Sequence, residues 1–449
     1  MMEHNRSSSM FVDLPAEPID RLSSPLKRFL HVEAASGVLL LFVTSVALIL
    51  ANSPLSNDFL NFWKTPVGFQ FASFEVSHSL KHWINDALMT IFFFVVGLEV
   101  KRELVLGELK DLRSASLPLI AAVGGMVVPA GLYLAFQAGE PGARGWGIPM
   151  ATDIAFVVGC LALLGSRVPT GFRILLLSLA IADDIGAILV IAIGYTSTLN
   201  LFVLLLGFLG IGCVVGLAQL GVRSVPIYFI VGVLIWFAFH ESGVHATIAG
   251  VILGLLTPAR SWVSGKHLRE IVYRFSAYLQ GEEVSEEKKD RATFRSVEVA
   301  ARESMSPLER LEASLHPWVS FLIMPLFAFA NAGVPFGSSD FWEPVKIAVI
   351  VGLVLGKPIG IWCFSWLAVQ AGLAKLPQGV TFGLLAVGGV LAGIGFTMAM
   401  FIADLALDEP LLSAAKIGIL FASAFCAGVG VFLLHWLLPN PSSVERTAA

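Results

Sequence analysis

The sequence predicts an all-α polytopic membrane protein, and three observations support this fold class. Of the 449 residues, 56% are hydrophobic and only 14% are charged, whereas a soluble globular domain carries about 25% charged residues. Twelve apolar stretches approach the length of about 17–25 residues that crosses a bilayer as a helix. Lysine and arginine are concentrated in alternate connections between these stretches. No basic stripe with interleaved aromatic residues is present, so we do not expect nucleic-acid binding.

The predicted spans form one membrane domain, residues 30–437, between polar tails at 1–29 and 438–449. The spans are residues 30–52, 82–100, 116–137, 147–164, 173–196, 200–222, 226–239, 242–257, 317–336, 344–369, 380–407 and 411–437. The seventh and eighth predicted spans are short, so they are also consistent with a single span that has been divided into two. Residues 258–316 hold ten Lys or Arg and ten Asp or Glu. They are predicted to be a charged cytoplasmic loop with helical pieces.

The distribution of positive charge predicts the orientation in the membrane. With twelve spans, 23 of the 29 Lys and Arg lie in the tails and in loops on the side of the termini, and four lie on the opposite side. Cytoplasmic loops carry such an excess. We therefore expect a multi-pass protein of the cytoplasmic (inner) membrane of a prokaryote, with both termini cytoplasmic. An odd number of spans would spoil this alternation, which favours the split near residue 240.

A short outward segment has the alternation of a β-hairpin. In PVGFQFASFEV (66–76), apolar residues alternate with polar or small ones on both sides of an Ala-Ser pair. Ala-Ser is not a favoured hairpin turn, and an ordinary surface ribbon is an equally good interpretation. An exposed hairpin edge can pair with a second copy of the chain, so this segment predicts a possible homodimer contact.

Two spans contain residues that interrupt helices. Span 147–164 contains Pro149 and Asp153, and span 380–407 contains Gly388, Gly389, Gly393 and Gly395. Each is the middle member of a three-helix group, spans 3–5 and spans 10–12. Interrupted spans in corresponding places of two inverted repeats indicate the binding site of a secondary transporter. The alternative is that the glycines allow close helix packing.

Two adjacent carboxylates, Asp183 and Asp184, lie in the middle of the fifth span. Each charged Asp at that depth costs roughly 2.5–3.5 kcal/mol, so such residues are functional candidates. Adjacent helical residues point about 100° apart, and the pair can therefore line one cavity wall but not act as a single clamp. The structural alternative is neutralisation by buried cations. Only Lys357 is well placed for that, which leaves one carboxylate over.

Further polar residues have both a functional and a structural interpretation. Thr152 and Asp153 offer the oxygen ligands that small hard cations prefer, although Asp153 is equally explained as a helix cap. His245 could titrate near neutral pH, but a hydrogen-bonded packing histidine is the more common case. Glu99, Lys101, Arg102 and Glu103 form a charge cluster at a helix end. Beside Glu312, this cluster either senses pH or consists of solvated end charges. The cysteines Cys160, Cys213, Cys363 and Cys426 are widely spaced in apolar segments without a CxxC motif, which predicts neither a disulfide framework nor a cysteine zinc site. We also expect no cofactor.

Taken together, these motifs resemble the NhaA family of sodium/proton antiporters over about residues 25–437. The matching stretches, in order, are WINDALM (83–89), FFVVGLEVKREL (93–104), ATDIAF (151–156), AIADDIGAI (180–188), SGVHATIAGV (242–251), LHPWVSFLIMPLFAFANAGV (315–334), LVLGKPIGI (353–361) and GIGFTMAMFIA (393–403). The resemblance implies exchange of cytoplasmic Na⁺ or Li⁺ for external H⁺ by alternating access, with pH-regulated activity. It also implies a transporter and not an enzyme, with the 66–76 hairpin as dimer contact.

The resemblance further implies a role for each matched residue. Asp183 and Asp184 would bind the transported Na⁺ and the proton, with Asp184 as the principal ligand. Lys357 would pair with Asp183, and Thr152 and Asp153 would lie where the fourth span unwinds and crosses the eleventh. Positions associated with pH regulation are Glu99, Arg102, Glu103, His245 and Glu312.

Two other functions also use buried carboxylates. An intramembrane aspartyl protease needs two aspartates on different helices that share a proton, which Asp183 and Asp153 could mimic. That mechanism leaves no place for Lys357 or for a second adjacent Asp. A cation channel can also contain broken helices and is harder to exclude from the sequence. Stoichiometry and the preference among Na⁺, Li⁺ and K⁺ are not encoded in recognisable motifs.

Overall fold

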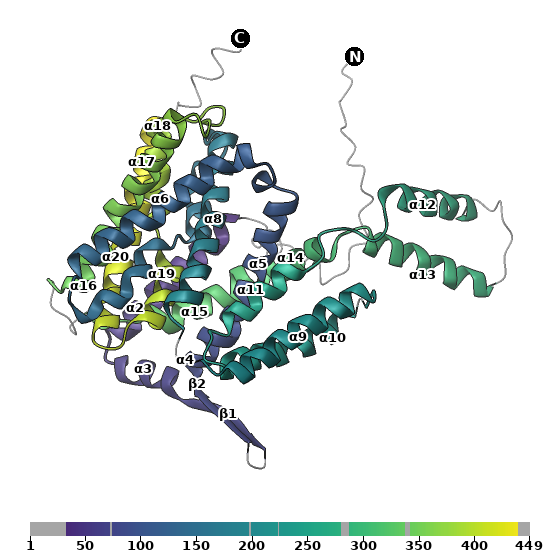
Figure 1. Ribbon diagram of the computed structural model, residues 1–449, viewed down its shortest axis with the longest axis horizontal. Coiled ribbons are helices and arrows are strands. Elements are labelled where there is room, and N and C mark those ends of the chain that lie inside the picture. Colours follow the sequence, from purple (N-terminus) through teal and green to yellow (C-terminus); the bar gives the residue numbers. More distant parts are fainter. Residues whose placement is uncertain are drawn as a thin grey trace, which may run out of the picture.

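The computed structural model describes residues 33–71, 74–196, 199–222, 224–279, 287–336 and 342–438. Apart from Leu438, both predicted tails lie outside these residues. The described chain is a bundle of helices with one small β-hairpin at one end (Figure 1). All-helical architecture with a two-stranded hairpin confirms the broad fold class that the composition predicts.

The first half of the chain supplies the hairpin and ten of the described α-helices. These are α2 (Glu33–Ala51), α3 (Ser56–Lys64), β1 (Pro66–Phe71), β2 (Phe74–Ser79), α4 (Leu80–Trp83), α5 (Met89–Val105), α6 (Leu112–Phe136), α7 (Ile154–Leu164), α8 (Thr170–Gly194), α9 (Leu201–Gln219), α10 (Val225–Glu241) and α11 (Thr247–Leu256). A π-helical turn, Ile84–Leu88, joins α4 to α5, and a 3₁₀ helix, Pro141–Met150, precedes α7.

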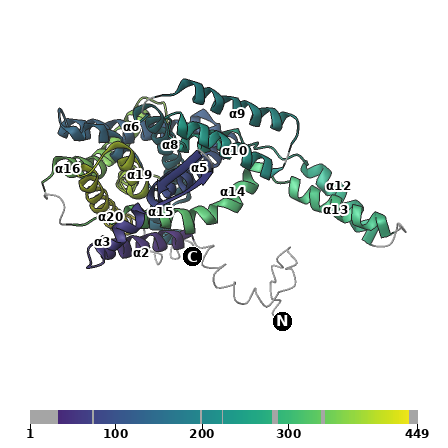
Figure 2. The ribbon, with the colours of Figure 1, turned by 90° about the horizontal axis from the view of Figure 1, so that it is seen from below.

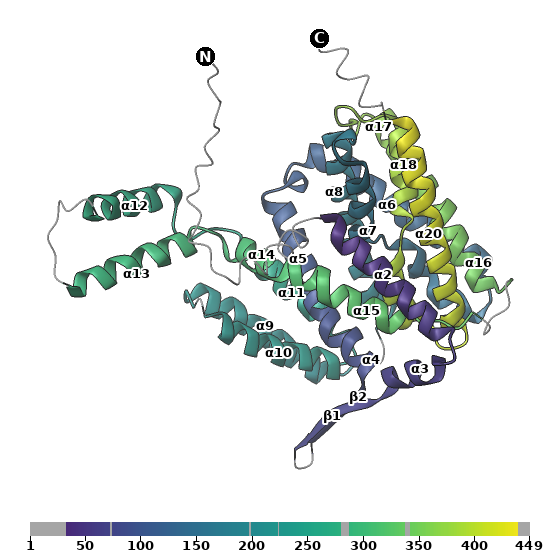
Figure 3. The same ribbon diagram turned by 180° about the vertical axis from the view of Figure 1, so that it is seen from behind.

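The second half begins with the charged segment and returns to the bundle. Its helices are α12 (Gly265–Leu279), α13 (Glu287–Glu303), α14 (Pro307–Trp318), α15 (Met324–Asn331), α16 (Pro344–Val351), α17 (Lys357–Gln370), α18 (Phe382–Ala392), α19 (Phe396–Ala406) and α20 (Leu411–Leu437). Seen from behind, α2 crosses the bundle beside α7 and α15, so the first described helix packs against helices from both halves (Figure 3).

The number of membrane-crossing helices is smaller by length and composition than the twelve predicted. The described residues contain eight such helices, or ten if α2 with α3 and α18 with α19 each count as one bent span. The predicted seventh and eighth spans correspond to α10 and α11, which are apolar but only 17 and 10 residues long. A multi-pass membrane fold is therefore established, and twelve crossings remain a prediction.

The predicted hairpin is present and is longer than its sequence pattern. Strands β1 and β2 pair antiparallel, with Phe71 opposite Phe74 and Pro66 opposite Ser79. The second strand passes Val76 and continues to Ser79, whose side chain accepts a hydrogen bond from the His82 N–H and so caps α4. The strand therefore ends where its last residue starts a helix.

The charged segment ends earlier than the sequence predicts. Helices α12 and α13 project away from the bundle (Figure 2), as expected for solvated helical pieces. Helix α14, however, starts at Pro307, ten residues inside the predicted 258–316 loop, and its helical run continues to Asn331. Ser306 and Glu309 form a reciprocal capping box, a start signal that the charge count concealed.

The four glycines of the predicted eleventh span have two different roles. Gly388 and Gly389 lie inside α18, where a Cβ would meet Leu176 Cδ2 at 2.9 Å and Pro358 Cα at 2.8 Å respectively. These two glycines allow close helix packing, which was the alternative to a helix interruption. Gly393 and Gly395 instead lie at the break before α19. The interruption is thus confined to residues 393–395.

Candidate ion-binding site

Two helix breaks meet in the middle of the bundle. The α18–α19 pair bends by 48° at residues 393–395, and the chain leaves the 3₁₀ helix at Met150 and re-enters a helix only at Ile154. The Asp153 N–H donates to the Ile394 carbonyl at 2.7 Å. The Thr152 hydroxyl is 2.9 Å from the Ala392 carbonyl, at the end of α18. Backbone groups freed by each break are thus satisfied by the other segment.

Asp153 caps both helices that restart at this crossing. Its Oδ1 accepts from the Phe156 N–H at 3.3 Å, at the start of α7. Its Oδ2 accepts from the Thr397 N–H at 3.0 Å and from the Thr397 hydroxyl, at the start of α19. A carboxylate between two helix N-termini is stabilised by both dipoles. The helix-cap interpretation of Asp153 therefore describes its contacts.

Asp183 is fully enclosed beside a lysine. Its Oδ2 lies 2.7 Å from Lys357 Nζ and 2.7 Å from the Thr152 hydroxyl, and neither charged side chain is exposed. Lys357 also donates to the Met150 carbonyl at the end of the 3₁₀ helix. The ion pair therefore joins α8 and α17 to the first helix break.

Asp184 occupies a different environment from its neighbour. It lines a cavity of about 1560 Å³, together with Thr152 and Asp153. Among the described residues, neither Asp183 nor Lys357 belongs to the lining. Asp184 Oδ1 is buried and has no hydrogen-bond partner in the described structure. Of the two adjacent carboxylates, one is paired inside the bundle and the other faces a large hollow.

The same cavity gathers four of the charged residues singled out in the sequence. Glu99, Arg102 and Glu103 from α5 and Glu312 from α14 all line it. Arg102 pairs with Glu312, and the Ser178 hydroxyl of α8 donates to Glu103 Oε1 at 3.2 Å. These residues connect the charged end of α5 to the helix that carries the two aspartates.

Comparison with known proteins gives the family. The profile described as Na⁺/H⁺ antiporter 1 matches residues 27–434. A Na⁺/H⁺ antiporter NhaA of Rhizobium meliloti is 54% identical over 96% of this chain and 98% of its own length. The chain belongs to the NhaA family of Na⁺/H⁺ antiporters. The resemblance inferred from the motifs is therefore confirmed, and NhaA is a family of transporters and not of enzymes.

Other relatives agree. A Na⁺/H⁺ antiporter NhaA of Rhodopirellula baltica is also 54% identical over 96% of this chain and 98% of its own, and the NhaA 2 of Acidiphilium cryptum is 51% identical over 97% of both chains. Among solved structures, the sodium proton antiporter MjNhaP1 of Methanocaldococcus jannaschii is similar at a TM-score of 0.48 and 12% identity, over 94% of this chain and 95% of that one. So distant a similarity adds nothing to the assignment.

One predicted residue of this NhaA chain, His245, belongs neither to the described cavity lining nor to the Asp183–Lys357 pair. The His245 Nε2 is 2.9 Å from the Tyr195 carbonyl, just after α8, and His245 is not part of the described lining. Its contact is the packing hydrogen bond that was the alternative to a pH-sensing role.

Sequence reasoning missed two features of the NhaA structure. Thr397 donates two hydrogen bonds to Asp153 where the two interrupted helices cross. Its position just after the GIG sequence (393–395) was the signal that could have identified it. Asp404, which is not among the predicted site residues, lies 3.0 Å from Lys416 Nζ and 3.2 Å from Lys81 Nζ. This second buried charge cluster lies at the hairpin end of the bundle, because Lys81 belongs to α4.

Proposed function

We propose that this NhaA-family chain exchanges cytoplasmic Na⁺, or Li⁺, for external H⁺ across the inner membrane of a prokaryote. The proposal includes twelve crossings, cytoplasmic tails at 1–29 and 438–449, and a cytoplasmic 258–316 segment. The family assignment and the excess of Lys and Arg on one side support it. Repeats formed by spans 3–5 and 10–12 would explain why one interrupted helix comes from each half.

The site assignment rests on the cavity that Asp184 lines. We assign Asp184 as the principal ligand of the transported ion because, of the two adjacent carboxylates, Asp184 is the one that lines the cavity in the described structure. Its buried Oδ1 also has no hydrogen-bond partner among the described residues. Thr152 and Asp153 line the same cavity and would complete an oxygen-rich site for a small hard cation. Asp183, neutralised by Lys357, would supply the second carboxylate of the pair.

Competition for one site accounts for coupling. A buried carboxylate binds a proton or a cation, and the bound proton excludes the cation. The charged end of α5 lines the cavity and lies on the side that we propose to be cytoplasmic. We therefore infer that this form gives the ion access from the cytoplasm. In the alternate form, access would be from the hairpin end, where Na⁺ leaves and H⁺ enters. Exchange then needs only one binding site and two alternating forms.

We also propose that pH regulates this exchange through charges in the cavity wall. Glu99, Arg102, Glu103 and Glu312 support this proposal because they share the cavity with Asp184. One of them, Glu103, also contacts α8 through Ser178. A change in the charge of this cluster therefore acts on the helix that carries the ion-binding pair. His245 stays a prediction without such a connection.

A homodimer through the hairpin is a separate proposal. A two-stranded hairpin has unpaired backbone groups on both outer edges, which can pair with a second copy. Removing residues 69–76 should convert a dimer into a monomer in size measurements made in detergent. A dimer that survives this deletion would place the contact elsewhere.

The alternative functions are less well supported by the contacts. A protease would need Asp153 and Asp183 to share a proton, but within the described residues no hydrogen bond joins them, and each carboxylate binds other donors. A channel would conduct Na⁺ without H⁺, which a flux measurement separates from exchange.

The decisive experiment reconstitutes the protein in vesicles. An imposed pH gradient should drive Na⁺ against its own gradient, and collapsing the pH gradient should stop this movement. Asp184→Asn should lose the exchange, whereas Asp408→Asn, which changes an exposed carboxylate, should retain it. Full exchange by Asp184→Asn would refute the site, and Na⁺ flux independent of the pH gradient would favour a channel.

A further inference from the structure

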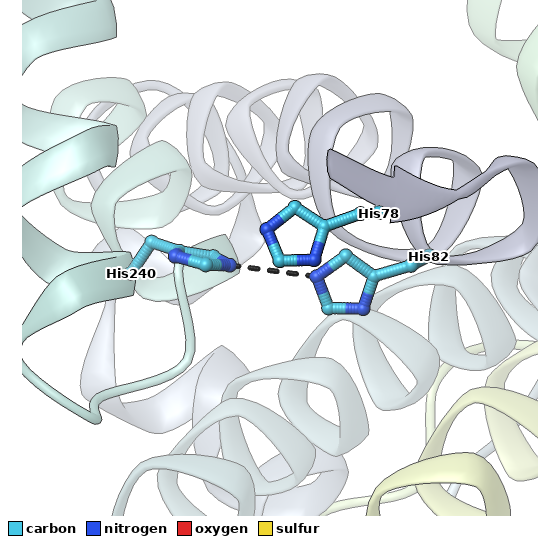
Figure 4. A group of neighbouring side chains, drawn as sticks. All are labelled: His78, His82 and His240. Carbon is cyan, nitrogen blue, oxygen red and sulfur yellow. Dashed lines mark hydrogen bonds between the residues drawn. The ribbon is translucent and has the colours of Figure 1, made fainter. Parts of the chain in front are cut away.

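Three histidines from separate segments meet at the hairpin end of the bundle. His78 comes from β2, His82 from α4 and His240 from the last turns of α10 (Figure 4). One ring nitrogen from each lies within 4.8 Å of the others. A fourth polar group, the carboxylate of Asp86, reaches the same point. None of these residues belongs to the cavity or to the proposed ion site.

The atoms are arranged as the face of a tetrahedron. His82 Nε2 and His240 Nε2 are 3.4 Å apart. Asp86 Oδ2 lies 3.3 Å from His82 Nε2 and 3.6 Å from His240 Nε2. Ligands about 2.0–2.1 Å from a tetrahedral zinc ion are separated by about 3.3–3.4 Å. The three atoms thus have the spacing of three ligands around one small ion.

His78 is placed to act as the fourth ligand. Its ring stacks on that of His82, with centroids 4.3 Å apart, and contacts the His240 ring at 5.5 Å. Figure 4 shows the His78 and His82 rings side by side, with the His240 ring directed at them. Three imidazoles and one carboxylate are a ligand set that suits zinc and related transition metals, and not Na⁺ or Mg²⁺.

The surroundings have the other properties of a metal site. His240 Nδ1 is 3.5 Å from Glu241 Oε1, the carboxylate contact that orients metal-bound histidines. Trp236 packs against His240 and stacks with Trp83, which shields one side. The side chains of His82 and Asp86 are 40% and 25% exposed, so ions in solution can reach them.

We propose that His78, His82, His240 and Asp86 form a binding site for a divalent transition-metal ion, with Zn²⁺ as the type ion. The site lies about 25 Å along α4 and α5 from Glu99, at about 1.5 Å per helical residue. It is therefore at the opposite end of the bundle from the cavity opening. A bound ion ties the base of the hairpin to α10.

The experiment measures metal binding by the full-length protein purified in detergent. Zn²⁺ affinity and stoichiometry are measured by calorimetry, and Co²⁺, which gives a visible absorption spectrum, reports four-coordinate geometry. His82→Ala and His240→Ala should each weaken Zn²⁺ binding by at least about 10–100-fold, the loss that removal of even an outer partner causes. His267→Ala is the matched control, because His267 lies on α12 and contacts only Ser264 among its described hydrogen bonds.

A ligand exchange guards against variants that merely misfold. His240→Cys replaces one ligand with a thiolate that zinc also accepts, so it should keep Zn²⁺ binding and add a sulfur-to-metal band to the Co²⁺ spectrum. Unchanged Zn²⁺ affinity in His82→Ala/His240→Ala would overturn the proposal. So would a cluster that binds protons but gives no four-coordinate Co²⁺ spectrum. Neither outcome bears on the Asp184 site, because these measurements involve no transport.

Discussion

Lys357 and Asp183 form an ion pair of 2.7 Å in which neither side chain is exposed to solvent. A buried pair of this kind adds little to stability by itself, but the loss of one partner leaves the other charge uncompensated. Lys357→Met should therefore destabilise the fold by about 3–5 kcal/mol, seen as a large drop in the unfolding temperature in detergent.

The same pair allows a double-variant test. Adding Asp183→Asn to Lys357→Met removes the orphaned charge and should recover part of the lost stability. Equal instability of the single and the double variant would show that the pair contributes packing and not charge compensation.

Asp153 predicts a stability effect of a different origin. Asp153→Ala removes the acceptor for the first N–H groups of α7 and α19, and each lost cap costs about 0.5–2 kcal/mol. Asp153→Asn keeps one amide oxygen and should lose less. Thermal unfolding of both variants measures the difference, and an unfolding temperature of Asp153→Ala equal to that of the unmodified protein would contradict the double-cap description.

Close packing predicts opposite outcomes for two glycine substitutions. In Gly389→Ala the new methyl group meets the Pro358 backbone at 2.8 Å, and such overpacking costs about 1–3 kcal/mol. Gly212→Ala in α9 meets nothing within 4 Å and should be neutral or stabilising, because alanine favours helices by about 1 kcal/mol over glycine. Unfolding temperatures of the pair provide the check.

The two lysines that contact Asp404 differ in how deeply they are buried. Lys416 is 5% exposed and Lys81 is 31% exposed, although both contact Asp404 Oδ1. Lys416→Ala should cost several times more stability than Lys81→Ala, because removing a buried partner costs about 3–5 kcal/mol and removing a solvated one about 0–1 kcal/mol. Equal losses would mean that Asp404 is solvated in solution.

The parts of the fold that follow local chemistry could be predicted from the sequence. The helix α20 coincides with its predicted span, 411–437, because a mostly apolar run lies between Pro410 and Pro439 in the sequence. The buried Asp183–Lys357 pair was within reach of sequence reasoning because charges are rare at that depth. Glu99, Arg102, Glu103 and Glu312 do share one cavity wall, yet only tertiary packing brings Glu312 to the others.

Other features depend on contacts between distant segments, which no local pattern reveals. The double capping by Asp153 needs Thr397, some 240 residues later. The start of α14 was hidden because its capping box lies within a charged run. His78 and His82 meet His240 only because β2 leads into α4 beside the end of α10, and no local pattern links these two stretches of the sequence.

The close contact between α6 and α17 bears on which parts of the bundle move. A Cβ at Gly124 would lie 2.3 Å from the Gly360 carbonyl, so the two backbones touch with no layer of side chains between them. Sliding of one helix past the other would require backbones to separate. Lys357 lies one turn before Gly360 and is thus held in place relative to α6. We therefore expect α6 and α17 to stay fixed relative to each other while other helices move. Spin labels on their outer faces should keep a constant separation while ions and pH change.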